Sequence, residues 1–324
     1  MNKVKLGAAG PEVSRYGLGC MAMSGMYGPS DEQESIATIH AAIDAGITLL
    51  DTGDFYGMGH NEMLIGRALE GRRDRVQISV KFGAMRGPDG MWIGVDGRPV
   101  AVRNFLAYSL KRLKTDHVDV YRLSRLDPNV PIEDTVGAIA EMVKAGYVRY
   151  IGLSEVGAAT IRRAAAVHPI CDLQIEYSLV SRGIEHEILP AVRELGIAVT
   201  AYGILSRGLL TGSPISGPHD IRDRMPRFAS GNIEQNASLI NSLAAFARRR
   251  NVTPAQVATA WVASRGSDII PLIGARTREQ LNDSLAPVEL SQGDLAELEA
   301  MVAAAPVAGT RYDAHQMRML DSER

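Results

Sequence analysis

The sequence predicts an α/β fold of the (β/α)8 TIM-barrel class, with an N-terminal β-hairpin and long loops over the C-terminal face. Short runs rich in Val, Ile and Leu alternate with longer amphipathic stretches through most of the 324 residues. This alternation is typical of βαβ units with parallel strands. Eight short runs occur, and eight strands close a barrel. A doubly wound sheet is disfavoured because no GxGxxG motif is present.

The predicted elements follow one another in strict alternation. The eight predicted strands are residues 16–20, 48–51, 77–82, 118–123, 150–154, 173–177, 198–202 and 269–273. The helices predicted between them include residues 31–45, 61–70, 102–114, 132–145, 159–167 and 186–195. A glycine follows several of these helices, as at Gly46, Gly146 and Gly196, which is typical of a helix C-cap before the next strand.

The sequence predicts one domain that spans residues 1–324. Three of its segments are predicted to lie outside the repeating pattern of strands and helices. Residues 1–14 combine Gly7, Gly10 and Pro11 with short alternating runs, which predicts a hairpin that closes the barrel floor. Residues 211–236 are rich in Gly, Pro, Ser and Arg, and the residues after Pro306 show no clear period. Both stretches are therefore predicted to be loops over one end of the barrel.

Composition excludes several classes of protein. The formal net charge is −2 and no dense basic run occurs, so nucleic acid is not an expected partner. No stretch approaches the roughly 18–20 apolar residues of a membrane span, and the N-terminus lacks a signal-peptide core, so we expect a soluble, cytoplasmic protein. Cys20 and Cys171 are far apart in the sequence and are interpreted as buried, reduced thiols. The sequence does not indicate an oligomeric state.

Polar side chains occur at the predicted strand ends, where TIM barrels place their active residues. Asp51 ends the second strand, Tyr56 follows in a glycine-rich turn, and Lys81 lies in the third strand. An adjacent ammonium would lower the tyrosine pKa from its usual value of about 10, and Asp51 would pair with the ammonium. Each residue alone is usually structural, but together they favour a functional site. No HxH motif and no cluster of His and carboxylate residues occurs at the predicted strand ends, so no metal site is predicted.

The sequence resembles the aldo-keto reductase family. The similarity runs through residues 51–57 (DTGDFYG), 59–62, 81, 118–123, 152–155, 174–178, 201–203, 206–208 and 271–274, in the family's order. Residues 309–312 are similar to the branch that contains potassium-channel β subunits and bacterial reductases. The resemblance implies reduction of an aldehyde or ketone with hydride from NADPH.

Three of the four catalytic residues that the resemblance implies are present: Asp51, Tyr56 and Lys81. The fourth, a histidine after the fourth strand, is replaced by Ser124. Serine can donate a hydrogen bond to a substrate oxygen but cannot become cationic. Ser124 would be an adaptation to a particular substrate, an engineered replacement, or a sign of lost activity. No histidine follows the fourth strand, and His60 is interpreted as a solvated loop residue.

The resemblance also implies residues for the nicotinamide end of NADPH/NADP+. Ser154 and Gln174 match the residues that bind the carboxamide. Glu155 occupies a position where many relatives have asparagine, and Tyr202 matches the aromatic ring on which the nicotinamide stacks.

Two further segments match the phosphate-binding parts of the family. Residues 203–211, which include Gly203, Leu205, Arg207 and Gly208, would surround the pyrophosphate. The residues at the start of the last helix that match the binding site of the adenosine 2′-phosphate are Gly274, Arg276, Gln280 and Ser284. NADPH is therefore expected in preference to NADH. Arg278 is either a further phosphate ligand or a solvated surface charge.

The expected partner is a small carbonyl compound with a hydrophobic body. Its apolar wall is predicted to come from residues after the first and third strands, namely Met21, Met23, Met26, Met85, Met91 and Trp92. Because of Ser124, an alternative function stays open, in which the chain is an NADP(H)-binding redox sensor or regulatory subunit with little turnover.

Overall fold

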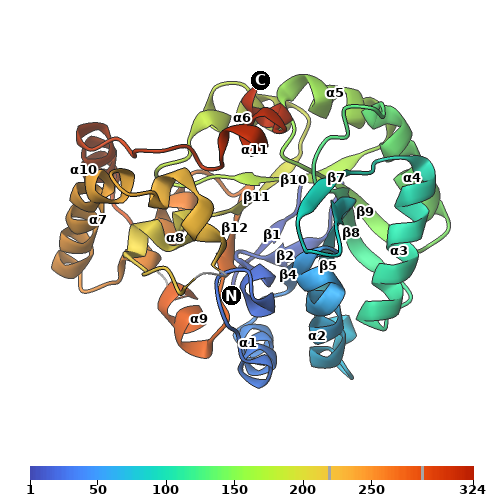
Figure 1. Cartoon of the computed structure of the whole chain (residues 1–324), viewed down its shortest axis with the longest axis horizontal. Helices are drawn as coiled ribbons and strands as arrows, with labels where there is room; N and C mark the ends of the chain where they lie inside the picture. The colour runs from blue at the N-terminus through green and yellow to red at the C-terminus, as the bar shows by residue number, and fades with distance from the viewer. Residues whose placement is uncertain (218–219, 286–287) are drawn as a thin grey trace.

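The computed structural model describes residues 1–217, 220–285 and 288–324, and within these ranges eight parallel strands close into a barrel (Figure 1). The barrel strands are β3 (Gly17–Gly19), β4 (Leu49–Gly53), β5 (Gln77–Phe82), β8 (Val118–Leu123), β9 (Val148–Ser154), β10 (Ile170–Glu176), β11 (Ala198–Tyr202) and β12 (Ile269–Gly274). Pairing of β12 with β3 joins the last strand to the first. The predicted (β/α)8 barrel is confirmed.

Helices surround the barrel on its outer side (Figure 1). They are α1 (Glu32–Asp44), α2 (His60–Ala68), α3 (Pro99–Leu113), α4 (Ile132–Lys144), α5 (Ala158–Val167), α6 (Ile188–Glu194), α8 (Pro254–Ser264) and α9 (Arg278–Leu285). Two more helices, α7 (Asn232–Arg249) and α10 (Gln292–Ala304), pack against each other at the left edge of the view. No helix in the described ranges is both long and apolar enough to cross a bilayer.

The floor of the barrel is closed by the predicted N-terminal hairpin. Strands β1 (Lys3–Lys5) and β2 (Glu12–Ser14) pair antiparallel. Leu6 and Val13 from this hairpin are fully buried in one apolar cluster with Leu49, Val120 and Ile270 from the barrel strands. Because the floor is closed by apolar side chains, the polar interior residues lie toward the opposite end.

Helix boundaries depend on capping groups. The side chain of Asp31 accepts a hydrogen bond from the Glu34 backbone N–H (2.7 Å) and starts α1 within one residue of the prediction. Helix α3 begins at Pro99, three residues before the predicted start, because proline has a suitable φ and lacks the N–H that a first helical turn leaves unpaired.

Three parts of the sequence prediction differ from the structure. Strands β6 (Ala84–Arg86) and β7 (Trp92–Val95) form an unpredicted antiparallel hairpin between β5 and α3. Residues 211–236 were predicted to be irregular, but α7 begins at Asn232; residues 218–219 of this stretch lie outside the described residues. The tail contains a short helix, α11 (Ala314–Arg318), which is capped by the Asp313 side chain. In these segments the hydrophobic pattern extends over too few residues to predict a strand or a helix.

Candidate active site at the mouth of the barrel

A cavity of about 1180 Å³ opens at the carboxyl ends of the barrel strands. Its lining comes from strand ends, the β6–β7 hairpin, residues 203–225 and the C-terminal tail. Such a volume exceeds that of most small-ligand pockets and suits a dinucleotide together with a small substrate. The predicted site residues that line it are Asp51, Tyr56, Lys81, Ser124, Ser154, Gln174, Tyr202, Gly203, Leu205, Arg207, Gly208, Gly274, Arg276, Gln280 and Ser284.

The carboxylate of Asp51 joins the polar groups beneath the cavity. Lys81 Nζ donates to its Oδ1 at 2.5 Å, Gln174 Nε2 to its Oδ2 at 2.6 Å, and Ser79 Oγ to its Oδ2 at 3.1 Å. All four side chains are buried. Burial lowers the pKa of Lys81 below its usual value, and the pair with Asp51 opposes this effect. The predicted Asp51–Lys81 ion pair is present.

A second buried ion pair lies next to this group. Arg122 and Asp172 are fully buried, with Arg122 Nη2 3.0 Å from Asp172 Oδ2. The same Nη2 donates to Ser79 Oγ (2.8 Å), and Thr200 Oγ1 donates to Asp172 Oδ2 (2.6 Å). Ser79 thereby connects Arg122 to Asp51. Shared hydrogen bonds of this kind offset the desolvation of the buried charges.

Tyr56 lies above this network in a turn with left-handed backbone at Gly57 and Met58 (φ 56° and 53°). Its ring packs edge-on against Phe55 (centroids 4.8 Å apart), and Lys81 Nζ lies 5.1 Å from its centroid. Burial, reinforced by the negative charge of Asp51, raises the pKa of Tyr56 well above its usual value. The expected net lowering of this pKa is therefore wrong, because burial and the charge of Asp51 outweigh the nearby ammonium.

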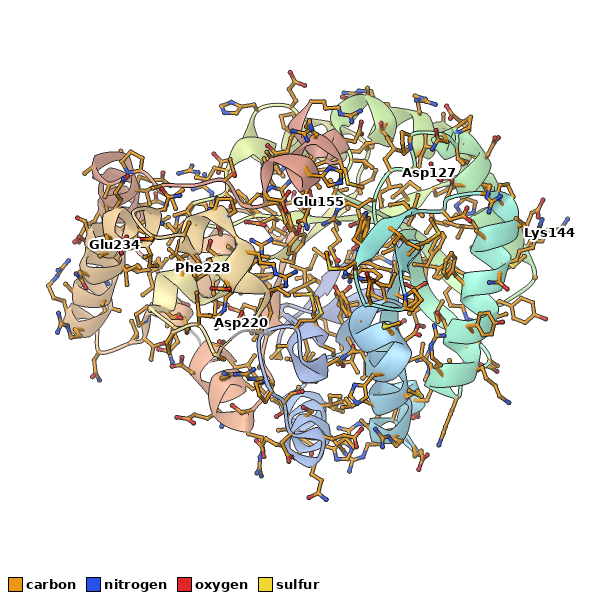
Figure 2. All side chains as sticks on the ribbon, viewed as in Figure 1. Asp127, Lys144, Glu155, Asp220, Phe228 and Glu234 are labelled. Atoms are coloured by element: carbon orange, nitrogen blue, oxygen red, sulfur yellow. The ribbon has the colours of Figure 1, made fainter. Side chains whose placement is uncertain are left out.

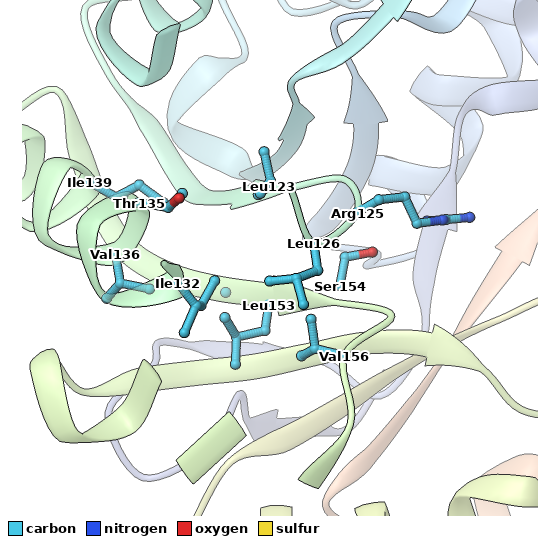
Figure 3. A pocket seen from close by; sticks show the side chains of 11 residues that line it. Leu123, Arg125, Leu126, Ile132, Thr135, Val136, Ile139, Leu153, Ser154 and Val156 are labelled. Carbon is cyan, nitrogen blue, oxygen red and sulfur yellow. The ribbon is translucent and has the colours of Figure 1, made fainter. Parts of the chain in front are cut away.

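Two buried hydroxyls in the cavity lining lack a hydrogen-bond partner among the described residues: Ser124 Oγ and Ser154 Oγ. In Figure 3 the Ser154 side chain points away from Ile132, Val136 and Ile139. These apolar residues line a separate void of only about 10 Å³, which is no larger than one water. An unpaired buried hydroxyl is costly, so both serines are suited to binding a ligand group.

No histidine lines the cavity in the part of the chain that the structure describes. His60 is partly exposed instead, where its Nδ1 lies 3.0 Å from Ser24 Oγ and its Nε2 lies 3.3 Å from Glu32. The partial exposure agrees with the interpretation of His60 as a solvated residue, but His60 begins α2 and does not lie in a loop.

Glu155 differs from its predicted role, since it is buried outside the cavity lining, with left-handed backbone (φ 53°). It lies beside the C-terminal segment in Figure 2. Its carboxylate accepts two hydrogen bonds from Arg311 (2.6 and 2.8 Å) and one from Tyr202 Oη (2.7 Å). Although burial favours the neutral acid, Arg311 holds the pKa of Glu155 well below its usual value. The Glu155 carboxylate is therefore held away from the cavity and is connected to it through Tyr202 Oη.

Tyr312, a cavity residue that the sequence analysis did not assign, links the tail to the site. Its hydroxyl lies 3.0 Å from Tyr202 Oη and accepts a hydrogen bond from Arg125 Nη2 (3.2 Å). The Arg207 guanidinium lies 4.5 Å from its ring centroid. The motif at residues 309–312 was the only feature of the sequence that could have indicated Tyr312 as a site residue. Its contacts with Tyr202 and Arg125 each span more than 100 residues and leave no local pattern in the sequence.

The arginines predicted to bind phosphate have different surroundings. Arg207 is in left-handed backbone (φ 58°) and donates to Glu176 (2.9 Å), so part of its guanidinium is already engaged. Arg276 donates to the Tyr27 carbonyl (2.8 Å), and its backbone N–H donates to Gln280 (3.0 Å). Arg278 is exposed and pairs with Glu34 of α1 (2.9 Å), so the surface-charge interpretation holds for this residue.

The predicted apolar wall is present in part. Met21, Met26, Met91 and Trp92 line the cavity. Met23 belongs instead to the main core, and Met85 is absent from the lining. Trp92 and Met91 reach the cavity because the unpredicted β6–β7 hairpin places them there.

Residues 15–303 match the aldo/keto reductase family. The chain belongs to the aldo/keto reductase family. This membership makes it an oxidoreductase. The chain is 42% identical over 318 residues to the probable aldo-keto reductase 1 of Glycine max, covering 95% of this chain and 91% of that protein.

Solved structures of other aldo/keto reductases share the fold. The glycerol dehydrogenase of Gluconobacter oxydans has a TM-score of 0.84 at 27% identity, covering 95% of this chain and 97% of that chain. An aldo-keto reductase from Klebsiella pneumoniae in complex with NADPH has a TM-score of 0.75 at 26% identity, covering 97% and 99%.

The buried pair in this aldo/keto reductase predicts a large effect of Asp51→Ala on stability. The change leaves the Lys81 ammonium buried without its carboxylate, so the free energy of unfolding should fall by about 3–5 kcal/mol in urea denaturation. Adding Lys81→Met should recover part of the loss. Glu70→Ala, which breaks an exposed pair with Lys114, is the control and should cost less than about 1 kcal/mol. Equal losses in Asp51→Ala and Glu70→Ala would contradict this account.

The buried carboxyl of Asp54, two residues before Tyr56, predicts a pH dependence of stability. Burial, reinforced by repulsion from Glu62, raises the pKa of Asp54 to about 7. The folded protein then binds a proton that the unfolded chain releases near pH 4, so stability decreases as pH rises from 4 to 7. Asp54→Asn should reduce this decrease by on the order of 2 kcal/mol in denaturation curves. Asp44→Asn, at an exposed position, is the control; a pH profile unchanged by Asp54→Asn would refute the prediction.

Proposed function

We propose that the chain, as one domain, reduces an aldehyde or ketone to an alcohol with NADPH as hydride donor. The observation that carries this proposal is that one cavity is lined by Asp51, Lys81, Tyr56 and Ser124, whose hydroxyl has no partner among the described residues. A proton donor beside a preorganised cation is the arrangement that carbonyl reduction requires.

The cavity residues fit the nicotinamide end of NADPH. Ser154 has a buried hydroxyl without a partner among the described residues. Gln174 uses its Nε2 on Asp51, which leaves its carbonyl oxygen to accept a hydrogen bond from a carboxamide. The Tyr202 ring lines the same cavity, and its hydroxyl is held by Glu155. When bound, NADPH supplies the hydride, and the relative from Klebsiella pneumoniae binds this same cofactor.

Tyr56 would donate the proton to the carbonyl oxygen. Its raised pKa keeps the phenol protonated at neutral pH. The positive charge of Arg125 favours the phenolate that forms as the proton leaves, and the Lys81 ammonium lies 5.1 Å from the ring centroid. Ser124 would donate a hydrogen bond to the same carbonyl oxygen, in place of the imidazole that the family normally has. The substrate body would pack against Met21, Met26 and Trp92.

Removal of the Tyr56 hydroxyl should abolish the reaction. In assays that follow NADPH consumption by absorbance over a panel of aldehydes and ketones, Tyr56→Phe should lower kcat by about 100-fold or more, the usual contribution of a general acid. Tyr108→Phe, at an exposed position on α3, is the matched control. Ser124→His should change the rate or the substrate range. Tight NADPH binding without Tyr56-dependent turnover, and without rescue by histidine, would favour a redox sensor or regulatory subunit.

Arg276 would contact the 2′-phosphate that distinguishes NADPH from NADH. Arg276→Gln should weaken NADPH binding about tenfold or more in fluorescence titrations and leave NADH binding nearly unchanged, since a charge-assisted hydrogen bond to phosphate is lost. Arg278→Gln removes the same charge from the surface pair with Glu34 and serves as the control. Equal weakening of NADPH and NADH in Arg276→Gln would exclude this role.

A further inference from the structure

Arg125 extends into the cavity directly after Ser124. Its Nη1 donates to the Ser124 carbonyl (2.7 Å) and its Nη2 to Tyr312 Oη (3.2 Å). In Figure 3 its side chain points away from the apolar residues around Ile132 and Ile139. Its positive charge acts on Tyr56, which lines the same cavity. The guanidinium is therefore held in place at the end of the cavity where the reaction would occur.

Arg125 lacks the carboxylate that other arginines at this end of the barrel possess. The pairs in the described residues are Arg122–Asp172, Arg207–Glu176, Arg222–Asp220, Arg227–Glu176 and Arg311–Glu155. No Asp or Glu oxygen in the described ranges lies within 4.0 Å of Arg125. Glu155, whose charge it senses, is engaged by Arg311 and Ser322. A partly buried guanidinium that no carboxylate contacts is available to a negative group of a ligand.

The remaining hydrogen-bonding capacity of Arg125 is suited to an anion. A guanidinium carries five N–H groups, and two of them are used by Ser124 and Tyr312. The planar group matches the geometry of a carboxylate, and its two existing contacts reduce the entropy that binding would cost. The phosphate-binding arginines proposed for the cofactor, Arg207 and Arg276, belong to other segments, after β11 and β12.

We infer that Arg125 binds a carboxylate of the substrate, and that the preferred substrates are aldehydes or ketones that carry such a group. This inference rests on the proposed reductase function. The carbonyl would lie at Tyr56 and Ser124, the carboxylate at Arg125, and the apolar body between them against Met21 and Trp92. Arg125 thus adds charge selection to a cavity whose walls select only for apolar bulk.

The test compares substrates that differ in charge and little in size. The three carboxybenzaldehyde isomers are each compared with the methylbenzaldehyde of the same substitution, by kcat/KM with NADPH. In the native protein at least one carboxylated isomer should be preferred. Arg125→Gln should lower that preference about tenfold or more, the loss expected for a charge-assisted contact. Arg125→Lys, which keeps the charge without the planar fork, should give an intermediate value.

Arg103→Gln is the matched control, because it removes the same charge from the exposed face of α3 and should leave the preference unchanged. An equal loss for charged and neutral aldehydes in Arg125→Gln would overturn the inference while leaving the reductase function intact. Absence of any Tyr56-dependent turnover would instead overturn the proposed function.

A binding measurement on the native protein tests the inference even if no substrate is turned over or the Arg125→Gln variant does not fold. With NADP+ present, benzoate should raise the thermal midpoint at concentrations at least tenfold lower than benzamide, its neutral analogue. Where Arg125→Gln folds, this difference should disappear. Equal effects of benzoate and benzamide on the native protein would exclude Arg125 as a carboxylate-binding residue.

Discussion

The buried carboxylate of Asp51 is the group on which the arrangement of the site depends, because it accepts hydrogen bonds from Lys81, Gln174 and Ser79 at once. These donors come from β5 and β10, so the carboxylate fixes the relative positions of β4, β5 and β10 at their carboxyl ends. The neighbouring Arg122–Asp172 pair is joined to this group through Ser79, and the apolar floor closes the barrel beneath it. A low local dielectric then makes each of these contacts stronger than it would be in water.

The C-terminal tail completes the cavity through a second set of buried charges. Arg311 joins Glu155, which follows β9, to Glu323 near the end of the chain. Tyr312 next to it contacts Tyr202, the last residue of β11, and Arg125, which follows β8. A segment without regular structure over most of its length is thus held by the buried Arg311–Glu155 pair and the more exposed Arg311–Glu323 pair. The substitution of Glu155 for the family's usual asparagine is coherent with this arrangement, since an amide carries no charge to pair with Arg311.

Charge is distributed unevenly along the cavity. The buried acids beneath the mouth are already paired with cations, whereas Arg125 and Arg276 have no carboxylate partner in the described ranges and face the cavity from different segments. Such a lining favours ligands that carry negative groups. Replacement of the usual histidine by Ser124 removes one titratable cation from the mouth. The cation that remains beside Ser124 is the guanidinium of Arg125, which stays charged at all working pH values.

The sequence by itself determined the barrel and the meeting of Asp51, Lys81 and Tyr56. Strand and helix periods are local, and the carboxyl ends of parallel strands converge at one face in any barrel of this kind. The family resemblance added Ser154, Gln174 and Tyr202 by position. Element boundaries were less well determined, as at Pro99 and Asn232, because caps and short hairpins depend on single residues.

Only the tertiary structure decided how these residues behave. Burial, rather than the nearby ammonium, sets the direction of the Tyr56 pKa shift. Glu155 is withdrawn from the cavity by an arginine that lies 156 residues further along the chain. Desolvation and pairing depend on which side chains meet in three dimensions, and a linear pattern does not contain that information.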